Sequence, residues 1–142
     1  MREFAVLCLE NLTHEESVAY CVQLVQVLKY ERHHYSPLAL LLLKRAIEDK
    51  DGEFYHSFVW NLKSEISQEN SSPHKNSVRY KLILEAFFSL CGEPQTSQFL
   101  RDFDLVESLK QLSLSVRSFR EKETDSQNVL NYFRKLLQNL PK

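Results

Sequence analysis

Histidine and cysteine are the residue types in this sequence that could bind a metal ion or attack a substrate. The chain contains five histidines and three cysteines. His33 and His34 are adjacent, so on a helix their side chains would point about 100° apart and could not share one ion. No pair of these residues has the spacing of a zinc motif. We therefore predict no metal site and interpret His33 and His34 as solvated loop residues.

The cysteines offer no better case for catalysis. Cys8, Cys21 and Cys91 lie in apolar stretches, where burial raises the pKa of a thiol and makes it unreactive. Their odd number and wide spacing favour free thiols in a reducing compartment. Because the chain has only two glycines, we predict no phosphate-binding loop. We predict no catalytic residue and no cofactor in this chain.

The charge and hydropathy of the sequence indicate which kinds of partner, nucleic acid or membrane, it could bind. The net charge is −1, which excludes a strong overall attraction to nucleic acid. Lys29, Lys44 and Arg45 could contact anionic lipid, but we interpret them as solvated or paired with nearby acidic residues. The longest apolar run, 38–43, is too short to span a bilayer, and the sequence opens without a signal-peptide pattern. We expect a cytoplasmic protein without direct membrane insertion.

The scarcity of glycine predicts an all-α fold, because hairpin turns need residues with positive φ. Thr13 and Glu16 have the spacing of a capping box at a helix start. Ser36-Pro37 is a second start, with serine as N-cap and proline at the first helical position. Gly92 stands where a left-handed C-cap ends a helix. These signals predict six or seven helices with short polar connections, among them a loop at 67–76.

Apolar residues at helical spacing predict the buried faces. We expect the segment 38–43, which is apolar nearly all round, to lie in the interior. Trp60 is expected to anchor the core, with a partner-binding role as the alternative. The expected buried stripes are Tyr20, Leu24, Val27 and Leu28; Phe54, Phe58, Leu62 and Ile66; Val78, Leu82, Ala86 and Leu90; Leu105, Leu109, Leu112, Val116 and Phe119; and, in a last helix starting at Thr124, Val129, Phe133, Leu136, Leu137 and Leu140.

Several of these helices are apolar on two faces, which favours stacking over a closed four-helix bundle. We predict stacked antiparallel helix pairs, an α-solenoid-like architecture.

Three segments in order carry a resemblance to a known family. The first is 4–10 followed by 23–31, the stretch Q-L-V-Q-V-L-K-Y-E. The second is 41–46, followed by the stretch 56–65 with its histidine, tryptophan and L-K-S-E. The third is 79–85 with Cys91-Gly92. Across residues 2 to about 120 they resemble the helical accessory (PIK) domain of the phosphoinositide 3-kinases, the class I enzymes more than the class III type.

This resemblance implies a non-catalytic scaffold. Residues 1–122 would be an accessory-domain segment without its first helices, and 123–142 a final helix leading toward a kinase domain that this chain lacks. Tyr55 departs from the glycine usual in the family, and extra polar residues occupy 48–53. The residues that match the family pattern, as structural or interface candidates, are Gln23, Gln26, Lys29, Tyr30, Glu31, Arg45, His56, Trp60, Lys63, Glu65 and Arg79.

The implied parent enzyme transfers the γ-phosphate of ATP to the 3-hydroxyl of a membrane phosphoinositide, with ATP and Mg²⁺ held in its kinase domain. The implied partners are the kinase, C2 and Ras-binding domains of the parent chain and a regulatory subunit, and the parent would be recruited to membranes. An isolated segment should then expose apolar surface that these domains cover. The alternatives are a free-standing helical-repeat adaptor that binds protein partners and a helical domain from a phosphatidylinositol 4-kinase.

Overall fold

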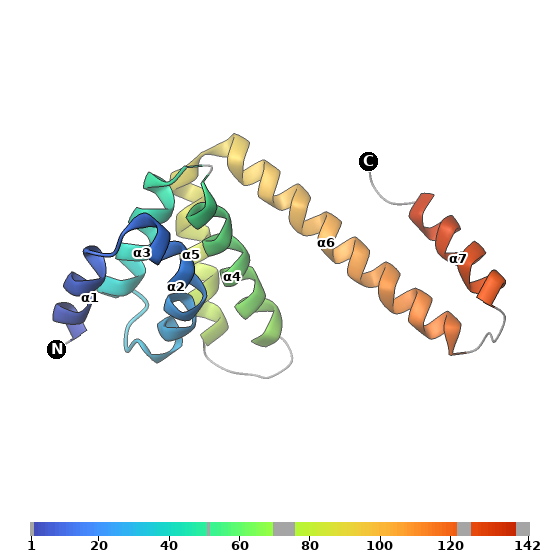
Figure 1. Ribbon diagram of the computed structural model, residues 1–142, viewed down its shortest axis with the longest axis horizontal. Helices are drawn as coiled ribbons and strands as arrows, with labels where there is room; N and C mark the ends of the chain where they lie inside the picture. Colours follow the sequence, from blue (N-terminus) through green and yellow to red (C-terminus); the bar gives the residue numbers. More distant parts are fainter. Residues whose placement is uncertain (1, 51, 70–75, 122–125, 139–142) are drawn as a thin grey trace. The chain divides into compact units, whose positions relative to one another are not determined.

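The computed structural model describes residues 2–50, 52–69, 76–121 and 126–138. Within these ranges the chain forms α-helices and one short 3₁₀ helix and no strand, which confirms the all-α prediction. The elements are α1 (Arg2–Glu10), α2 (His14–Val27), η1 (Leu28–Tyr30), α3 (Pro37–Glu48), α4 (Glu53–Glu69), α5 (Asn76–Cys91), α6 (Glu93–Arg120) and α7 (Ser126–Gln138) (Figure 1).

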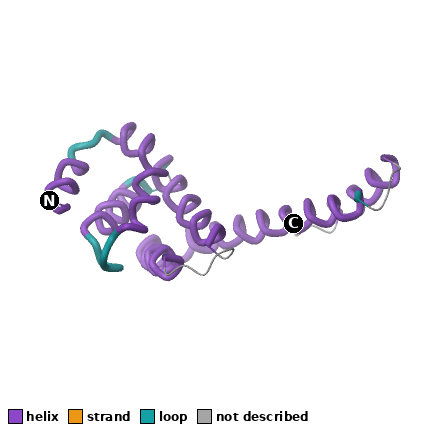
Figure 2. Tube along the Cα trace, turned by 90° about the horizontal axis from the view of Figure 1, so that it is seen from below, coloured by secondary structure: helices purple, strands orange, loops and turns teal. Residues whose placement is uncertain are grey.

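The helices divide into two compact units. Unit 1 is Met1–Gly92 and contains α1 to α5; unit 2 is Glu93–Lys142 and contains α6 and α7. The boundary expected between residues 122 and 123 marks the end of the accessory domain. It does not describe which helices cluster together, so it stays a prediction. The connections that the structure describes within unit 1 are short (Figure 2).

The helices of unit 1 are packed around α4. Helix α2 packs against α4, and α3 packs against α5, while α4 also contacts α3 and α5. Helix α4 therefore lies at the centre of this unit, in contact with α2, α3 and α5. The all-α class is confirmed, and the finer arrangement as a solenoid of antiparallel pairs stays a prediction. Helix α1 packs on α3.

Two predicted helix starts are confirmed in detail. Thr13 Oγ1 accepts from the backbone N–H of Glu16 at 3.2 Å, and a Glu16 carboxylate oxygen accepts from the N–H of Thr13 at 2.8 Å, which completes the capping box. Ser36 Oγ accepts from the N–H of Ala39 at 3.2 Å. Gly92 has φ of 93°, the left-handed conformation expected after α5.

The core of unit 1 is aromatic. The predicted stripe on α4 is confirmed, because its four members are buried: Phe54, Phe58, Leu62 and Ile66. The ring of Phe58 lies 6.2 Å from that of Phe54 and 6.0 Å from that of Phe87 on α5. Such ring pairs stabilise a core beyond the area they bury.

The predicted stripe on α2 is wrong for most of its members. Tyr20 is 53% exposed and Val27 44%, and Leu24 is half-buried, whereas Leu28 is buried as expected. The residues that α2 turns inward are the small Ser17 and Cys21 and the residue Val25; Val25 was expected to widen the buried stripe, together with Val18, which is half-buried, and Val22, which is exposed. Small side chains allow α2 to approach its neighbours closely, so the larger apolar residues remain on the outer face.

On α5 the buried face is also rotated from the predicted one. Val78, Leu82 and Leu90 are exposed and Ala86 is half-buried. The buried residues are Arg79, Tyr80, Ile83 and Phe87. Aromatic side chains bury the largest areas, so the helix turns Tyr80 and Phe87 inward in preference to its aliphatic residues.

Three other predictions on unit 1 had mixed outcomes. The segment 38–43 is mostly interior, although Leu40 is exposed. Trp60 is half-buried, so it is a partial anchor of the core. Of the predicted loop 67–76, residues 67–69 belong to α4 and residue 76 to α5, whereas residues 70–75 lie outside the described ranges.

Unit 2 is a helix pair in which α7 packs on α6. The rings of Phe119 and Tyr132 stack across the pair, with centroids 4.3 Å apart. Leu112, Val116 and Phe119 of the predicted seam are half-buried, as are Val129, Phe133 and Leu136 on α7. Leu105, Leu109 and Leu137 are exposed instead of buried, because two helices alone can shield only the stretch along which they touch. Thr124 and Leu140 lie outside the described residues.

Candidate functional site

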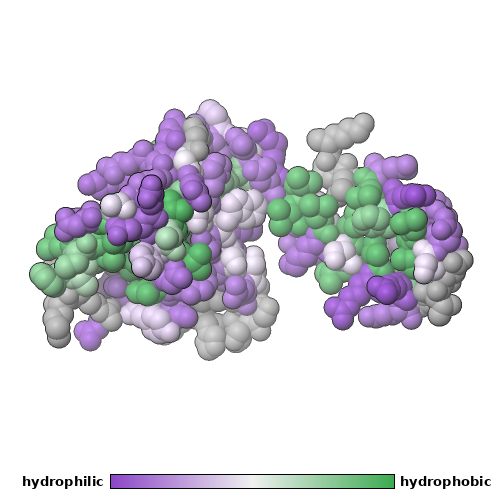
Figure 3. Space-filling model, viewed as in Figure 1, coloured by the Kyte–Doolittle hydropathy of each residue, from purple (hydrophilic) through white to green (hydrophobic). Residues whose placement is uncertain are grey.

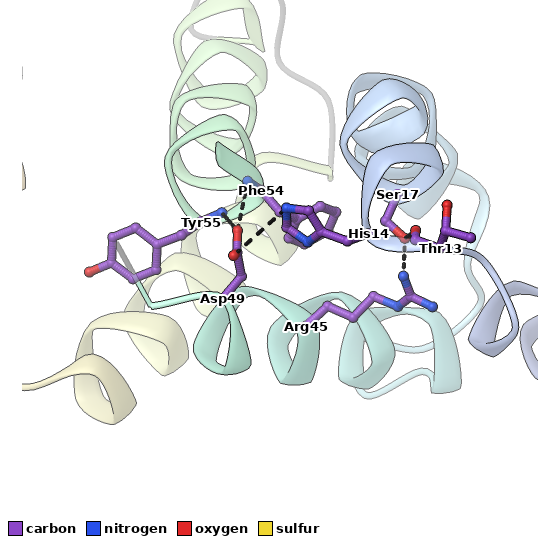
Figure 4. A network of polar contacts seen from close by, with 7 residues as sticks. All are labelled: Thr13, His14, Ser17, Arg45, Asp49, Phe54 and Tyr55. Carbon is purple, nitrogen blue, oxygen red and sulfur yellow. Dashed lines mark hydrogen bonds and ion pairs between the residues drawn. The ribbon is translucent and has the colours of Figure 1, made fainter. Parts of the chain in front are cut away.

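A polar network centred on Arg45 joins the first helices of unit 1 (Figure 4). Arg45 lies on α3 and is half-buried. Its Nη2 donates to the backbone oxygens of Leu9, Glu10 and Leu12, at 3.0, 2.9 and 3.0 Å. Its Nη1 donates to Ser17 Oγ on α2. One side chain on α3 therefore binds the end of α1, the following turn and the start of α2.

The chemistry of this contact follows from the end of a helix. The last carbonyls of α1 have no partner within the helix, and the helix dipole makes that end negative. A guanidinium offers five N–H donors in a planar fork and a fixed positive charge. Arg45 thus satisfies carbonyl oxygens with charge-assisted hydrogen bonds. The expectation that Arg45 is solvated or paired with an acid is wrong, whereas Lys44 does pair with Glu48, at 3.9 Å.

Asp49 joins the next two helices. It is the C-cap residue of α3, where its N–H donates to the oxygen of Arg45 at 3.0 Å. Its carboxylate accepts from the N–H groups of Phe54 and Tyr55 at 2.9 and 3.3 Å, at the start of α4. His14 Nε2 lies 3.8 Å from the same carboxylate. A negative charge at a helix N-terminus is favourable, so Asp49 fixes the corner between α3 and α4.

A second network is centred on Arg79, which is only 6% exposed. Its Nη1 and Nη2 donate to the backbone oxygens of Leu28 and Glu31, each at 2.5 Å. The adjacent Tyr80 hydroxyl lies 3.4 Å from the oxygen of Val25. Helix α5 is thereby bound to backbone carbonyls at the end of α2, in η1 and directly after η1.

The family-pattern residues of α2 and η1 point largely to solvent. Gln23, Gln26, Lys29 and Tyr30 are exposed, and Glu31 is half-buried. Lys29 Nζ lies 5.0 Å from the centroid of the Tyr30 ring, at cation–π distance. These residues share the outer surface of α2 and η1 with Tyr20 and Val27.

The remaining family-pattern residues lie on α4. His56 is exposed, and Trp60, Lys63 and Glu65 are half-buried. Spacings of four and three residues place His56, Trp60 and Lys63 along one side of the helix. The structure therefore separates the family-pattern residues into two arginine networks, an outer α2–η1 surface and one side of α4, with Glu65 on the opposite side of α4.

The site contains residues that the sequence patterns missed. Ser17 belongs to the Arg45 network, and Asp49 joins α3 to α4. Neither residue is among those predicted from the sequence. Asp49 lies four residues before Glu53, the first residue of α4, whereas the N-cap preference concerns the residue directly before a helix, so its position gave no capping signal. Ser17 carries no signal either, because its partner lies 28 residues further along the chain.

A groove of about 590 Å³ opens beside the Arg45 network. Both carboxylates and cations line it, including Glu10, Glu48, Asp49, Lys44 and Arg45. Among the described residues, no three histidine, cysteine or acidic side chains come together as metal ligands. No helix in the described ranges is long and apolar enough to cross a membrane.

The three cysteines differ in environment. The described Cys8 is exposed and Cys91 is half-buried, so the prediction that both are buried is wrong; Cys21 is buried as predicted. Helix α1 leaves Cys8 uncovered because only one of its sides packs on α3. Burial raises the pKa of the Cys21 thiol, and hydrogen bonds with Ser57 and Asn61 partly oppose this shift.

We expect Cys8 to react with a thiol reagent such as DTNB at pH 8 well before Cys21. Cys21 should react only after urea unfolds the chain, because it is both inaccessible and held protonated. Folding raises the pKa of the Cys21 thiol. The stability that Cys21 contributes as a neutral thiol is therefore fully present below the pKa of the unfolded thiol, and it is lost as the pH rises through the pKa of the folded one. Peptide mapping of the labelled cysteines tests this order, and fast labelling of Cys21 in the folded chain would contradict the burial.

The fold and the networks define an all-helical domain whose polar side chains hold helices together. Comparison with known proteins then identifies the family. The family model described as the phosphoinositide 3-kinase family accessory domain (PIK domain) matches residues 1–100. The chain belongs to this family, as the resemblance of its three sequence segments predicted.

Relatives with established names are similar over most of the chain. Phosphatidylinositol 3-kinase 1 of Dictyostelium discoideum is 34% identical over 123 residues, 87% of this chain and 7% of that protein. The human phosphatidylinositol 4-phosphate 3-kinase C2 domain-containing subunit beta is 37% identical over 117 residues, 82% of this chain and 7% of that protein. Phosphatidylinositol 3-kinase pik3 of Schizosaccharomyces pombe is 35% identical over 127 residues, 84% of this chain and 16% of that protein. The chain thus spans a small part of each relative's length.

Proposed function

We propose that this chain is the helical scaffold of a phosphatidylinositol 3-kinase. The observation that carries the proposal is the similarity, over 82–87% of this chain, to two proteins named phosphatidylinositol 3-kinases and to one named as a subunit of a phosphatidylinositol 4-phosphate 3-kinase. In this proposal the parent enzyme phosphorylates the 3-hydroxyl of a phosphoinositide with ATP, and ATP and Mg²⁺ bind in its kinase domain. The parent is cytoplasmic and is recruited to membranes, and its class I character is part of the proposal.

Exposed apolar side chains support a role in packing against other domains. In unit 1 they occur on α1, on the outer face of α2 and η1, and on α3 and α5. Figure 3 shows apolar surface over the α1 end of the unit. Proteins rarely leave large contiguous apolar surface exposed unless it binds something. The proposed partners are the kinase, C2 and Ras-binding domains of the parent chain and a regulatory subunit.

Within this proposal the family-pattern residues have two roles. Arg45 and Arg79 are structural, because Arg45 binds three backbone carbonyls at the end of α1 and in the turn after it, and Arg79 binds two carbonyls, in η1 and directly after it. Gln23, Gln26 and Tyr30 are interface residues, because they are exposed on one helical surface. The accessory-domain segment extends to residue 122, and residues 123–142 lead toward the kinase domain.

An immunoprecipitation tests the parent activity. An antibody raised against residues 14–66 is used to blot native cell extract and to immunoprecipitate its antigen. The precipitate is then incubated with labelled ATP, Mg²⁺ and phosphatidylinositol vesicles. We expect a band several times heavier than the 16.8 kDa of this chain and a labelled lipid with phosphate on the 3-hydroxyl. Precipitation in the presence of excess recombinant chain is the control, because it should remove both signals.

Other outcomes would overturn the proposal. A single band at the mass of this chain, without lipid kinase activity, would indicate a free-standing helical adaptor. A heavy band whose precipitate labels the 4-hydroxyl would assign the parent to the phosphatidylinositol 4-kinases.

A further inference from the structure

Helix α1 buries little apolar surface against the rest of unit 1. None of its side chains that the structure describes is buried. Phe4 is 71% exposed and Leu7 57%, and Val6 and Leu9 are half-buried. Its packing is on α3. The apolar contribution to its docking is therefore small, because that contribution scales with the area removed from water.

A helix as short as α1 depends on its docking. In the 142-residue chain it comprises nine residues, Arg2–Glu10, and isolated helical segments shorter than about 12–15 residues are marginal in water. Once α1 leaves α3, its backbone hydrogen bonds are therefore expected to open as well. Docking and folding of α1 form one local equilibrium, separate from the global unfolding of the unit.

Arg45 supplies the polar part of the docking. It donates to the oxygens of Leu9, Glu10 and Leu12, which are the end of α1 and its following turn. The capping box of Thr13 and Glu16 holds the first turn of α2 by contacts within α2 itself. Helix α1 can therefore leave without unwinding α2, and the hinge is the link between Leu12, whose oxygen Arg45 binds, and Thr13, the N-cap of α2.

We propose that α1 is a hinged arm that opens and closes on α3, with Arg45 as its latch. A groove of about 420 Å³ lies between the arm and α3. The arm lines it with Val6 and Leu7, and α3 lines it with Leu40 and Leu41. Leu41 is buried in the closed form, so opening exposes an apolar strip on α3. The latch thus controls how much apolar surface this end of the domain presents.

Hydrogen–deuterium exchange of the 142-residue chain, read by mass spectrometry, tests the arm. In the unmodified chain, amides of α1 should exchange at least tenfold faster than those of α4. In Arg45→Met, exchange in α1 should rise at least another tenfold, while α4 and α5 change less than twofold. Lys81→Met is the control, because Lys81 is an exposed cation on α5 that lines neither groove beside α1, and it should leave exchange in α1 unchanged.

Arg45→Lys is a second variant for the case in which Arg45→Met does not fold. Lysine keeps the charge but not the planar fork, so exchange in α1 should rise by a smaller factor than in Arg45→Met. The proposal is overturned if α1 in the unmodified chain is as protected as α4. It is also overturned if either variant at Arg45 raises exchange equally in α1, α4 and α5, because Arg45 would then stabilise the whole unit. These results do not depend on the kinase activity of a parent protein.

Discussion

Phe58→Ala is expected to lower the free energy of unfolding of unit 1 by about 3–5 kcal/mol. Phe58 has no exposed surface and its ring contacts those of Phe54 and Phe87. Removing it loses the transfer free energy of a ring and leaves a cavity between α4 and α5, which cannot collapse fully in a close-packed interior. Urea denaturation followed by the fluorescence of the single tryptophan, Trp60 on α4, measures the change.

Phe4→Ala is the matched control for this prediction. It makes the same chemical change on α1, where the ring is 71% exposed. We expect a loss below about 1 kcal/mol, which is usual for substitutions away from a packed core. Equal losses for the two variants would show that the aromatic cluster is not the centre of stability in unit 1.

Arg79→Met is expected to cost about 2–3 kcal/mol, because a buried carbonyl that loses a charged donor costs about 1–3 kcal/mol. The oxygens of Leu28 and Glu31 would both lose their donors. The cost stays below the sum of the two bonds because the variant also removes a buried charge. It removes Arg79 Nε as well, which has no hydrogen-bond partner among the described residues.

Lys81→Met is the control on the same helix, since Lys81 is exposed two residues further on. It should change the free energy of unfolding by less than about 0.5 kcal/mol. The same urea titration compares the two variants. If Arg79→Met were as mild as its control, water would be satisfying the carbonyls and the Arg79 network would not hold η1.

Much of the fold could be predicted from the sequence because its signals are local. The Thr13–Glu16 capping box, the Ser36-Pro37 start and the Gly92 stop each depend on residues within a few positions of one another. The stripe Phe54, Phe58, Leu62 and Ile66 repeats at four-residue intervals, and all four residues are buried. The family could be predicted for a similar reason, since it depends on short ordered motifs.

The buried faces of α2 and α5 could not be predicted, because both helices carry apolar residues on more than one side. On α2 the small residues Ser17 and Cys21 face inward while Tyr20 remains outside. Periodicity alone does not say which of two apolar faces meets this core and which meets another surface. The arginine networks were beyond prediction as well, since Arg79 lies 51 residues from Leu28 in sequence.

The shared cap at Asp49 has a consequence for how the chain folds. Its carboxylate binds N–H groups only five and six residues ahead, and its own N–H closes the last turn of α3. Contacts between residues so close in sequence cost little loop-closure entropy and form quickly. The corner between α3 and α4 is therefore suited to form early in folding, before the long-range bonds of Arg45 and Arg79 close. Helices α3 and α4 would then enter the later steps as a preformed pair onto which α2 and α5 pack.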